Sequence, residues 1–351
     1  MNYNDAIRNT FNQWVNKARV PGNAFVRVYC PSRSVDIQLA ASLIDKAPLP
    51  VDQPNYLASC GKLFTATLVA QLVEAGKLGF YDPIGHYLDP ELMSGLHLYR
   101  GQDYSDQITV RHLLSQTSGL PDHFWPLLKR LVKEPGFDLS TREAIEWSKT
   151  HMKPRFRPGQ GFNYTDINYH LLGLILEQIE DEPFHDILHR QLFQPLGMTH
   201  SSVLHCSAPA AADTLPVADF YLDKTAINPL KAYAALDYAG GSVVAPLNEA
   251  LIFMQALVNH QLISQETLTT MQSDKTRFNP IIEYGYGIWQ LRPTFLILPQ
   301  KYQCWGVVGA TGAFMFYHPG LEAYLIGNFN SSRYMRKGVR FLMSLIKALD
   351  Q

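Results

Sequence analysis

Apolar positions follow helical and strand-like patterns in separate stretches of this 351-residue chain. Residues 5–18 have the period of an amphipathic helix and end at Val20-Pro21-Gly22. Residues 23–29 and 34–41 have the length and composition of two paired strands. A long apolar helix is expected to begin at Ser59.

Helical patterns broken by proline and glycine dominate from about 80 to 235, and strand patterns return near the C-terminus. The expected helices cover 109–115, 124–133, 141–151, 169–179, 184–193 and 247–259. The expected strands cover 286–292, 305–308, 313–317 and 322–328, and a closing helix covers 333–349.

This order of elements predicts an α+β fold. Strands at both ends of the chain must meet in one sheet if the helical middle is an insertion. We therefore expect an antiparallel sheet flanked by N- and C-terminal helices, formed by residues 1–79 and 236–351. A mainly helical lobe of residues 80–235 would be inserted into it, with a functional cleft between the two lobes.

The helix that begins near Ser59 is apolar almost all round until Gly76, which is typical of a buried central helix. Ser59 and Lys62 are three residues apart and so share a helix face. Serine becomes a nucleophile when a base takes its proton, and burial near a helix N-terminus favours the neutral amine that can be that base. An N-cap serine followed by a solvent-reaching lysine has the same spacing, and Ser344 and Lys347 repeat it in an ordinary terminal helix.

The wider segment carries more information than the spacing. Residues 56–66 read Tyr-Leu-Ala-Ser-Cys-Gly-Lys-Leu-Phe-Thr-Ala, and 74–78 and 82–84 continue the pattern. This run resembles the active-site helix of the β-lactamase-related serine hydrolases, which include class C β-lactamases, serine D-alanyl-D-alanine peptidases and esterases, and in which Ser-x-x-Lys is the nucleophile motif. Family-like segments follow in order at 113–121, 158–166, 195–198, 239–242 and 284–287. The resemblance spans roughly residues 20–330 and implies a β-lactamase/transpeptidase-like fold.

Tyr164 follows a Pro-Gly turn and precedes the helical stretch 169–179, which distinguishes it from the other Tyr-x-Asp triplets of the chain. The resemblance implies that Tyr164 relays protons between Ser59, Lys62 and the leaving group. An adjacent ammonium favours a phenolate, so the protons of Lys62 and Tyr164 form one coupled system. The sequence leaves open which of the two is the formal base.

Asp166 stands where most members of the resembled family have asparagine. A carboxylate there can accept a hydrogen bond from Lys62, but it also favours the ammonium form and so opposes the role of Lys62 as a base. Aspartate just before an apolar helix is equally a good N-cap. Both interpretations stay open at the level of sequence.

The third family motif normally supplies a cation on a strand that lines the cleft. Aligning Gly309 with the motif glycine places Val307 at the cation position, and aligning Gly312 instead also leaves no cation. We prefer the first alignment, in which Val307 and Val308 form an apolar wall. Losing a charge-assisted contact costs about 1.5–3 kcal/mol, which favours esters or amides without a free carboxylate, unless Arg292 or Arg333 replaces the cation.

The resemblance also implies an oxyanion hole made by the backbone N–H groups of Ser59 and Ala310. The expected substrate-binding residues are Asp166, Val307, Val308, Gly309, Trp305, His123 and Phe124. Trp305 and the loop at 124–125 are the candidates for an apolar pocket. We expect no cofactor and no metal, because the pair His185 and His189 has no indicated third ligand and fits a plain surface helix.

Composition narrows the classes of function. A net charge of −1 gives no electrostatic footprint for nucleic acid, and no apolar run approaches the length of a membrane span. The polar N-terminus lacks the layout of a secretion signal, so the chain as given is expected to be cytoplasmic, or exported if its N-terminus was trimmed. Four cysteines without paired spacing fit free thiols.

Together these features predict a serine hydrolase that acts through an acyl-enzyme intermediate on a small ester or amide, with β-lactams and D-amino-acid peptides as further substrate types. The alternatives are a ligand-binding pseudoenzyme impaired by Asp166 and Val307, and a penicillin-binding protein that does not release its product. The partner is expected to be a small-molecule substrate, with no nucleic acid and no membrane. Oligomeric state stays open.

Overall fold

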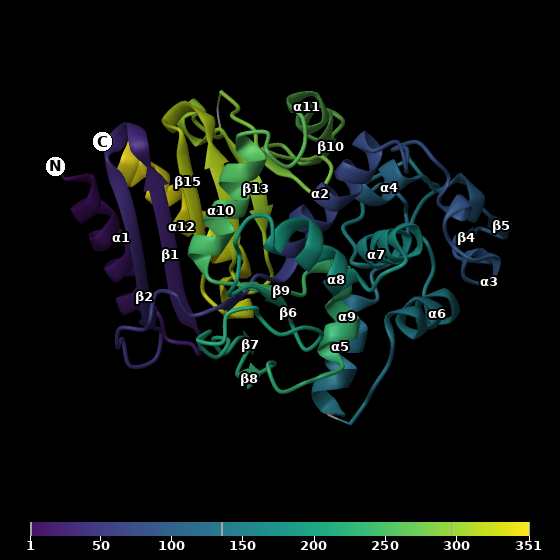
Figure 1. Ribbon diagram of the computed structural model, residues 1–351, viewed down its shortest axis with the longest axis horizontal. Coiled ribbons are helices and arrows are strands. Elements are labelled where there is room, and N and C mark those ends of the chain that lie inside the picture. Colours follow the sequence, from purple (N-terminus) through teal and green to yellow (C-terminus); the bar gives the residue numbers. More distant parts are fainter. Residues whose placement is uncertain (1, 135, 296, 351) are drawn as a thin grey trace.

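An antiparallel sheet of eight strands joins the two ends of the chain (Figure 1). This computed structural model describes residues 2–134, 136–295 and 297–350. The strands of the sheet are β1 (Asn23–Cys30), β2 (Val35–Ser42), β10 (Thr276–Asn279), β11 (Ile282–Tyr284), β12 (Trp289–Leu291), β13 (Cys304–Val308), β14 (Phe314–His318) and β15 (Ala323–Asn328). Their order is β10-β11-β12-β13-β14-β15-β1-β2.

The pairing of β1 with β15 confirms that strands from both ends meet in one sheet, with Val26 opposite Gly327. Helices α1 (Tyr3–Lys17) and α12 (Met335–Leu349) pack on each other and on one face of this sheet (Figure 1). Alternate β1 side chains such as Val26 and Val28 face these two helices. Helix α10 (Leu247–Val258) covers the other face, where Phe25 points. The fold is therefore the expected α+β fold, with an antiparallel sheet flanked by the N- and C-terminal helices.

The remaining helices gather mainly beside the sheet (Figure 1). They are α2 (Gly61–Glu74), α3 (Pro90–Met93), α4 (Val110–Leu114), α5 (Phe124–Lys133), α6 (Thr141–His151), α7 (Ile167–Glu180), α8 (Phe184–Leu188), α9 (Tyr233–Asp237) and α11 (Gln265–Ser273). Every residue of α2 from 61 to 70 is buried, and α7 packs directly against it. Because α2 is apolar on nearly all sides, it is buried at the centre of the molecule.

Small strands complete the architecture. A three-stranded sheet contains β3 (Asn55–Tyr56), β9 (Val243–Ala245) and β6 (Ser202–Val203). Its strand β3 ends shortly before α2 begins in the chain. Two short hairpins pair β4 (Leu98–Tyr99) with β5 (Gln102–Asp103), and β7 (Tyr221–Leu222) with β8 (Thr225–Ala226).

The structure differs from the predicted elements mainly between 265 and 292. Helix α11 and strands β10 and β11 were not predicted, because β10 is largely exposed and obtains its conformation by pairing with β11. The expected strand 286–292 is reduced to β12. The expected helix 184–193 ends as α8 at Leu188 and continues as a π-helical turn, His189–Phe193. The lobe boundaries near 79 and 235 stay predictions.

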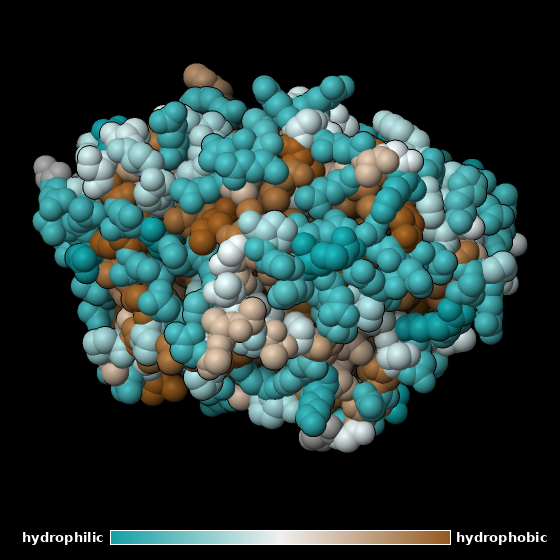
Figure 2. All heavy atoms as spheres, viewed as in Figure 1, coloured by the Kyte–Doolittle hydropathy of each residue, from teal (hydrophilic) through white to brown (hydrophobic). Residues whose placement is uncertain are grey.

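Polar side chains cover most of the face shown in Figure 2, where apolar residues form small separate patches. None of the described helices has both the length and the apolar character needed to cross a bilayer.

Candidate active site

Ser59 lies in a single 3-10 turn, Ala58–Cys60, between β3 and α2. Ala58 adopts a left-handed backbone conformation with φ of 51°, which costs an L-residue about 1–2 kcal/mol. The surrounding structure holds the turn, because the N–H of Leu57 donates to Val243 O at 2.9 Å and that of Cys60 to Leu57 O at 3.2 Å. The turn fixes where Ser59 stands at the helix start.

Two glycines allow a neighbouring segment to approach this turn closely. A Cβ on Gly241 would lie 2.7 Å from the carbonyl carbon of Ala58, and one on Gly61 would lie 2.9 Å from the Cα of Gly241. Real Cβ atoms do not come so near to backbone atoms. The close approach also brings the carbonyl of Gly240 to the side chain of Lys62.

Lys62 has no exposed surface, and its ammonium lies directly behind Ser59. Its Nζ donates to Ser59 Oγ at 3.2 Å, to Gly240 O at 2.7 Å and to the carboxylate of Asp166. A lysine ammonium has three donors, and each of them finds an acceptor here. The amine therefore points at the nucleophile and not into solvent.

Asp166 stands at the N-terminus of α7, but its side chain makes no capping hydrogen bond. Instead it forms an ion pair with Lys62, and only 9% of its side chain is exposed. The sequence left two roles open for Asp166. This geometry favours its role as the ion-pair partner of Lys62 over a role as the N-cap of α7.

Tyr164 completes the group. Its ring centre lies 5.2 Å from Lys62 Nζ, and rings of Tyr284 and Trp289 lie 5.9 and 5.5 Å away. Burial raises the pKa of Tyr164 well above its ordinary value, the charge of Asp166 raises it further, and the side-chain interaction with Ser59 acts in the opposite direction. In this arrangement the phenol keeps its proton at neutral pH.

Two further carboxyl groups surround the site and were not predicted. Burial and the charge of Asp166 raise the pKa of both Asp122 and Asp237 to about 7. Asp237 accepts a hydrogen bond from the hydroxyl of Tyr56, three residues before Ser59. The sequence held one indication of them, since Asp122 directly follows the family-like segment 113–121 and Asp237 lies just before 239–242.

The end of β13 packs against the nucleophile turn. A Cβ on Gly309 would lie 2.7 Å from Leu57 O and 3.0 Å from the Cβ of Ala58. Ala310 follows at this contact, and we find no hydrogen-bond acceptor for its backbone N–H or for that of Ser59 among the described residues. These are the two donors expected for an oxyanion.

Several predicted substrate-binding residues lie elsewhere. Val307 has no exposed surface and packs in the core on the α2 side of the sheet, while Val308 points to the opposite face. Side chains alternate along a strand, so the two valines do not form a shared apolar wall. His123 is also fully buried, with its ring 5.0 Å from that of His170. Trp305 is nearly buried.

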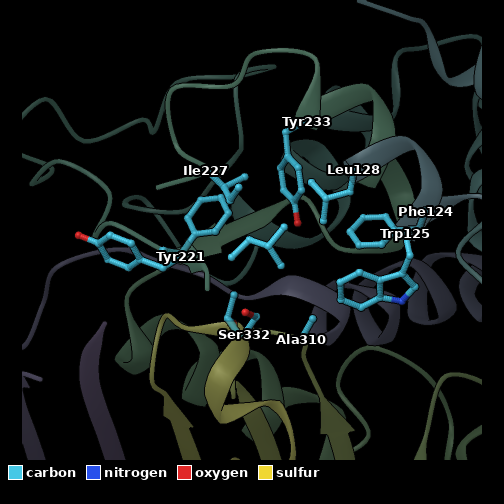
Figure 3. A pocket seen from close by; sticks show the side chains of 11 residues that line it. Phe124, Trp125, Leu128, Tyr221, Ile227, Tyr233, Ala310 and Ser332 are labelled. Carbon is cyan, nitrogen blue, oxygen red and sulfur yellow. The ribbon is translucent and has the colours of Figure 1, made fainter. Parts of the chain in front are cut away.

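Ala310 is also one of the residues around a small apolar pocket (Figure 3). It is lined by Phe124, Trp125, Leu128, Phe220, Tyr221, Leu222, Ile227, Tyr233, Ala310, Thr311 and Ser332. Figure 3 shows the labelled aromatic and aliphatic side chains on one side and Ala310 with Ser332 on the other. The structure thus places Phe124 and Trp125 at a pocket, as expected, but not Trp305.

Both arginines that were candidates to replace the missing cation, Arg292 and Arg333, already form ion pairs. Arg333 Nε lies 2.7 Å from Asp223 Oδ1, and Arg292 Nη1 lies 3.5 Å from Glu283 Oε1. In the part of the chain that the structure describes, no three His, Cys, Asp or Glu side chains are arranged to hold a metal ion.

The fold and these motifs define a β-lactamase-like protein. A family model described as Beta-lactamase matches residues 7–340, and the chain belongs to that family. It is similar to a penicillin-binding protein of Bacillus subtilis (strain 168), with 26% identity over 275 residues that cover 72% of this chain. The chain spans about half the length of such relatives, 55% in this case.

Solved structures share the fold. The D-amino acid amidase of Ochrobactrum anthropi SV3, complexed with L-phenylalanine amide, superimposes with a TM-score of 0.78 at 21% identity and covers 100% of this chain and 99% of its own. EstCE1, a hydrolase with promiscuous acyltransferase activity, gives a TM-score of 0.80 at 19% identity with the same coverage. At these identities the likeness shows the fold alone.

Proposed function

We propose that this protein is a serine hydrolase that forms an acyl-enzyme with a small ester or amide lacking a free carboxylate. The observation that carries the proposal is the contact between the buried Lys62 ammonium and Ser59 Oγ at 3.2 Å. Similar folds whose names print an amidase and a hydrolase with acyltransferase activity support the reaction class.

In the proposed reaction Ser59 Oγ attacks the carbonyl carbon, and the N–H groups of Ser59 and Ala310 stabilise the oxyanion. The serine proton enters the Lys62–Tyr164 pair, so the reactive form of that pair holds one proton fewer than the arrangement described above. The pair returns the proton to the leaving group as its bond to the carbonyl carbon breaks. Water then attacks the acyl-enzyme, and the acid is released with Ser59 restored.

The ion pair between Asp166 and Lys62 favours a second candidate, acylation without efficient release. A carboxylate that stabilises the ammonium makes the lysine a poorer proton acceptor in the step that activates water. In that case the protein would trap a β-lactam as a stable acyl-enzyme.

A fluorophosphonate probe, a chromogenic ester and a chromogenic cephalosporin distinguish these candidates. Labelling of Ser59 together with ester turnover, both absent from Ser59→Ala and strongly reduced in Lys62→Ala, supports the hydrolase. A stable cephalosporin adduct without turnover supports penicillin binding. If folded wild-type protein reacts with none of the three, the site is not catalytic and the pseudoenzyme alternative replaces the proposal.

A further inference from the structure

A row of aromatic side chains connects Tyr164 with the protein surface. The ring of Trp289 lies 5.5 Å from that of Tyr164, and the ring of Phe278 lies 5.3 Å from that of Trp289. Phe162 lies 5.5 Å from Phe278. Tyr284, which is buried, lies 5.0 Å from Trp289 and 5.6 Å from Phe162. These five residues are called the aromatic row below.

Strand pairing fixes the position of the row. Tyr284 of β11 is directly opposite Trp289 of β12, so their side chains share one face of the sheet. Phe278 is the additional residue of a β-bulge on the edge strand β10, where the pairing with β11 shifts between Arg277 and Asn279. Bulges change the direction of a side chain and are frequent beside active sites. The sheet itself therefore sets where Phe278 stands.

Two features of the row are unfavourable for stability. Phe278 is 48% exposed, and Phe162, Tyr164 and Trp289 are each partly exposed, so the row presents apolar surface to water. The indole N–H of Trp289 is buried, and it has no hydrogen-bond acceptor among the described residues. A buried donor without an acceptor costs free energy. Local arrangements that lower stability are expected mainly at functional sites.

The side chains of the row carry no charge at neutral pH. Burial raises the pKa of both Tyr164 and Tyr284 above the ordinary value of a phenol, and the other three side chains do not ionise. Glu283, which precedes Tyr284 in β11, is paired with Lys275 at 2.6 Å. Its side chain points to the opposite face, because successive side chains alternate along a strand. The row therefore fits a neutral, apolar group.

The row begins at the residue that can return a proton to the leaving group. Lys62 has no exposed surface, and its three donors already have acceptors. Tyr164 is partly exposed, and its side chain interacts with that of Ser59. Tyr164 is therefore the member of the pair that can reach the departing oxygen or nitrogen. The substituent on that atom then lies next to the row.

We propose that the leaving group of the substrate is an alcohol or amine that carries an aromatic ring, and that Trp289 and Phe278 bind this ring. This inference rests on the proposed function and specifies one half of its substrate. As the bond to the carbonyl carbon breaks, Tyr164 gives its proton to the departing oxygen or nitrogen. The acyl group stays on Ser59, and the ring leaves with the alcohol or amine.

The test places one phenyl group on either side of the ester bond. Phenethyl acetate and methyl hydrocinnamate are isomers, and so are their phenyl-free counterparts, ethyl acetate and methyl propionate. The leaving-side ratio is kcat/KM for phenethyl acetate divided by that for ethyl acetate. The acyl-side ratio is kcat/KM for methyl hydrocinnamate divided by that for methyl propionate. Both acetates form the same acyl-enzyme, so the leaving-side ratio reports only the step in which the alcohol departs.

For the wild-type protein we expect a leaving-side ratio of about ten or more, because the ring buries apolar surface against other aromatic rings. We expect it to exceed the acyl-side ratio, since the row lies on the side of the departing group. Equal reactivity of the two phenyl esters relative to their counterparts would contradict this placement.

Substitutions in the row test which residues bind the ring. Phe278→Ala and Trp289→Leu should each lower the leaving-side ratio by about threefold or more and leave the acyl-side ratio unchanged. Phe278→Tyr keeps a ring and should preserve the leaving-side ratio. Tyr99→Ala, at a partly exposed ring of the β4–β5 hairpin outside the row, is the matched control and should change neither ratio.

The outcomes separate the two proposals. If Ser59 is labelled and the acetates are hydrolysed, but the leaving-side ratio does not exceed the acyl-side ratio, the leaving-group inference is overturned and the hydrolase stands. A leaving-side ratio that neither Phe278→Ala nor Trp289→Leu lowers also overturns the inference. If no ester is hydrolysed and Ser59 is not labelled, both proposals fall. The comparison on wild-type protein decides the matter even if Trp289→Leu does not fold.

Discussion

The carboxylate of Asp166 and the ammonium of Lys62 form a buried ion pair directly behind Ser59. Removing one member of a buried pair leaves the other charge uncompensated, which typically costs about 3–5 kcal/mol. The pair is thus a structural element of the site, and it also sets the charge that surrounds the nucleophile.

Replacing Asp166 by asparagine keeps an acceptor for Lys62 but removes the negative charge. The ammonium of Lys62 is then stabilised less strongly, which should help the pair to accept the proton of Ser59. We expect kcat/KM for a neutral ester at neutral pH to rise by about threefold to tenfold. An unchanged kcat/KM would show that the charge of Asp166 does not limit proton transfer in the site.

Lys62→Ala should lower ester turnover by about 10²–10⁴-fold, the usual contribution of a proton-transferring group. Because this variant also leaves Asp166 unpaired, its folding must be measured separately. The double variant Lys62→Met with Asp166→Asn removes both charges and serves as the control, since it should be well folded and still inactive. Activity in that double variant would contradict a role for Lys62 in proton transfer.

Gly241→Ala should disturb the nucleophile turn, since the new Cβ would meet backbone atoms of Ala58. We expect a loss of about 1–3 kcal/mol in the free energy of unfolding, as for other overpacked sites, and a fall in Ser59 labelling. Gly136→Ala is the control, because nothing lies within 4 Å of the added atom there. Equal stability of the two variants in urea denaturation would refute the close-packing argument.

The raised pKa of Asp237 should make the free energy of unfolding depend on pH. Because burial raises its pKa to about 7 in the folded protein, the folded state keeps a proton that the unfolded chain releases near pH 4. Its contribution is fully present below about pH 4, falls as the pH rises through about 7, and is then lost.

The variant Asp237→Asn cannot ionise and should remove this dependence. Relative to wild type it should gain stability at pH 8 compared with pH 5, by at most about 2.7 kcal/mol. Urea unfolding of both proteins at the two pH values measures the difference. A constant difference between the variants at both pH values would mean that Asp237 does not take up a proton on folding.

The sequence by itself determined the elements whose pattern is repeated over many residues. Residues 61–70 are apolar on nearly all sides, which predicted that α2 is a buried helix. Helices α5 and α6 lie at the ranges that their hydrophobic periods predicted. The spacing of Ser59 and Lys62 predicted their contact, because positions three apart on a helix are neighbours whatever surrounds them.

Tertiary structure alone decided the charge balance of the site and the direction of several side chains. Asp122 and Asp237 reach Asp166 from segments 44 and 71 residues away in the chain, and the energy of a charge depends on through-space distance and burial. Which face of β13 holds Val307, and that Arg333 is paired with Asp223, likewise followed only from how distant segments pack. Local patterns fix where elements form, whereas electrostatics and pocket shape arise from contacts between elements that no local pattern contains.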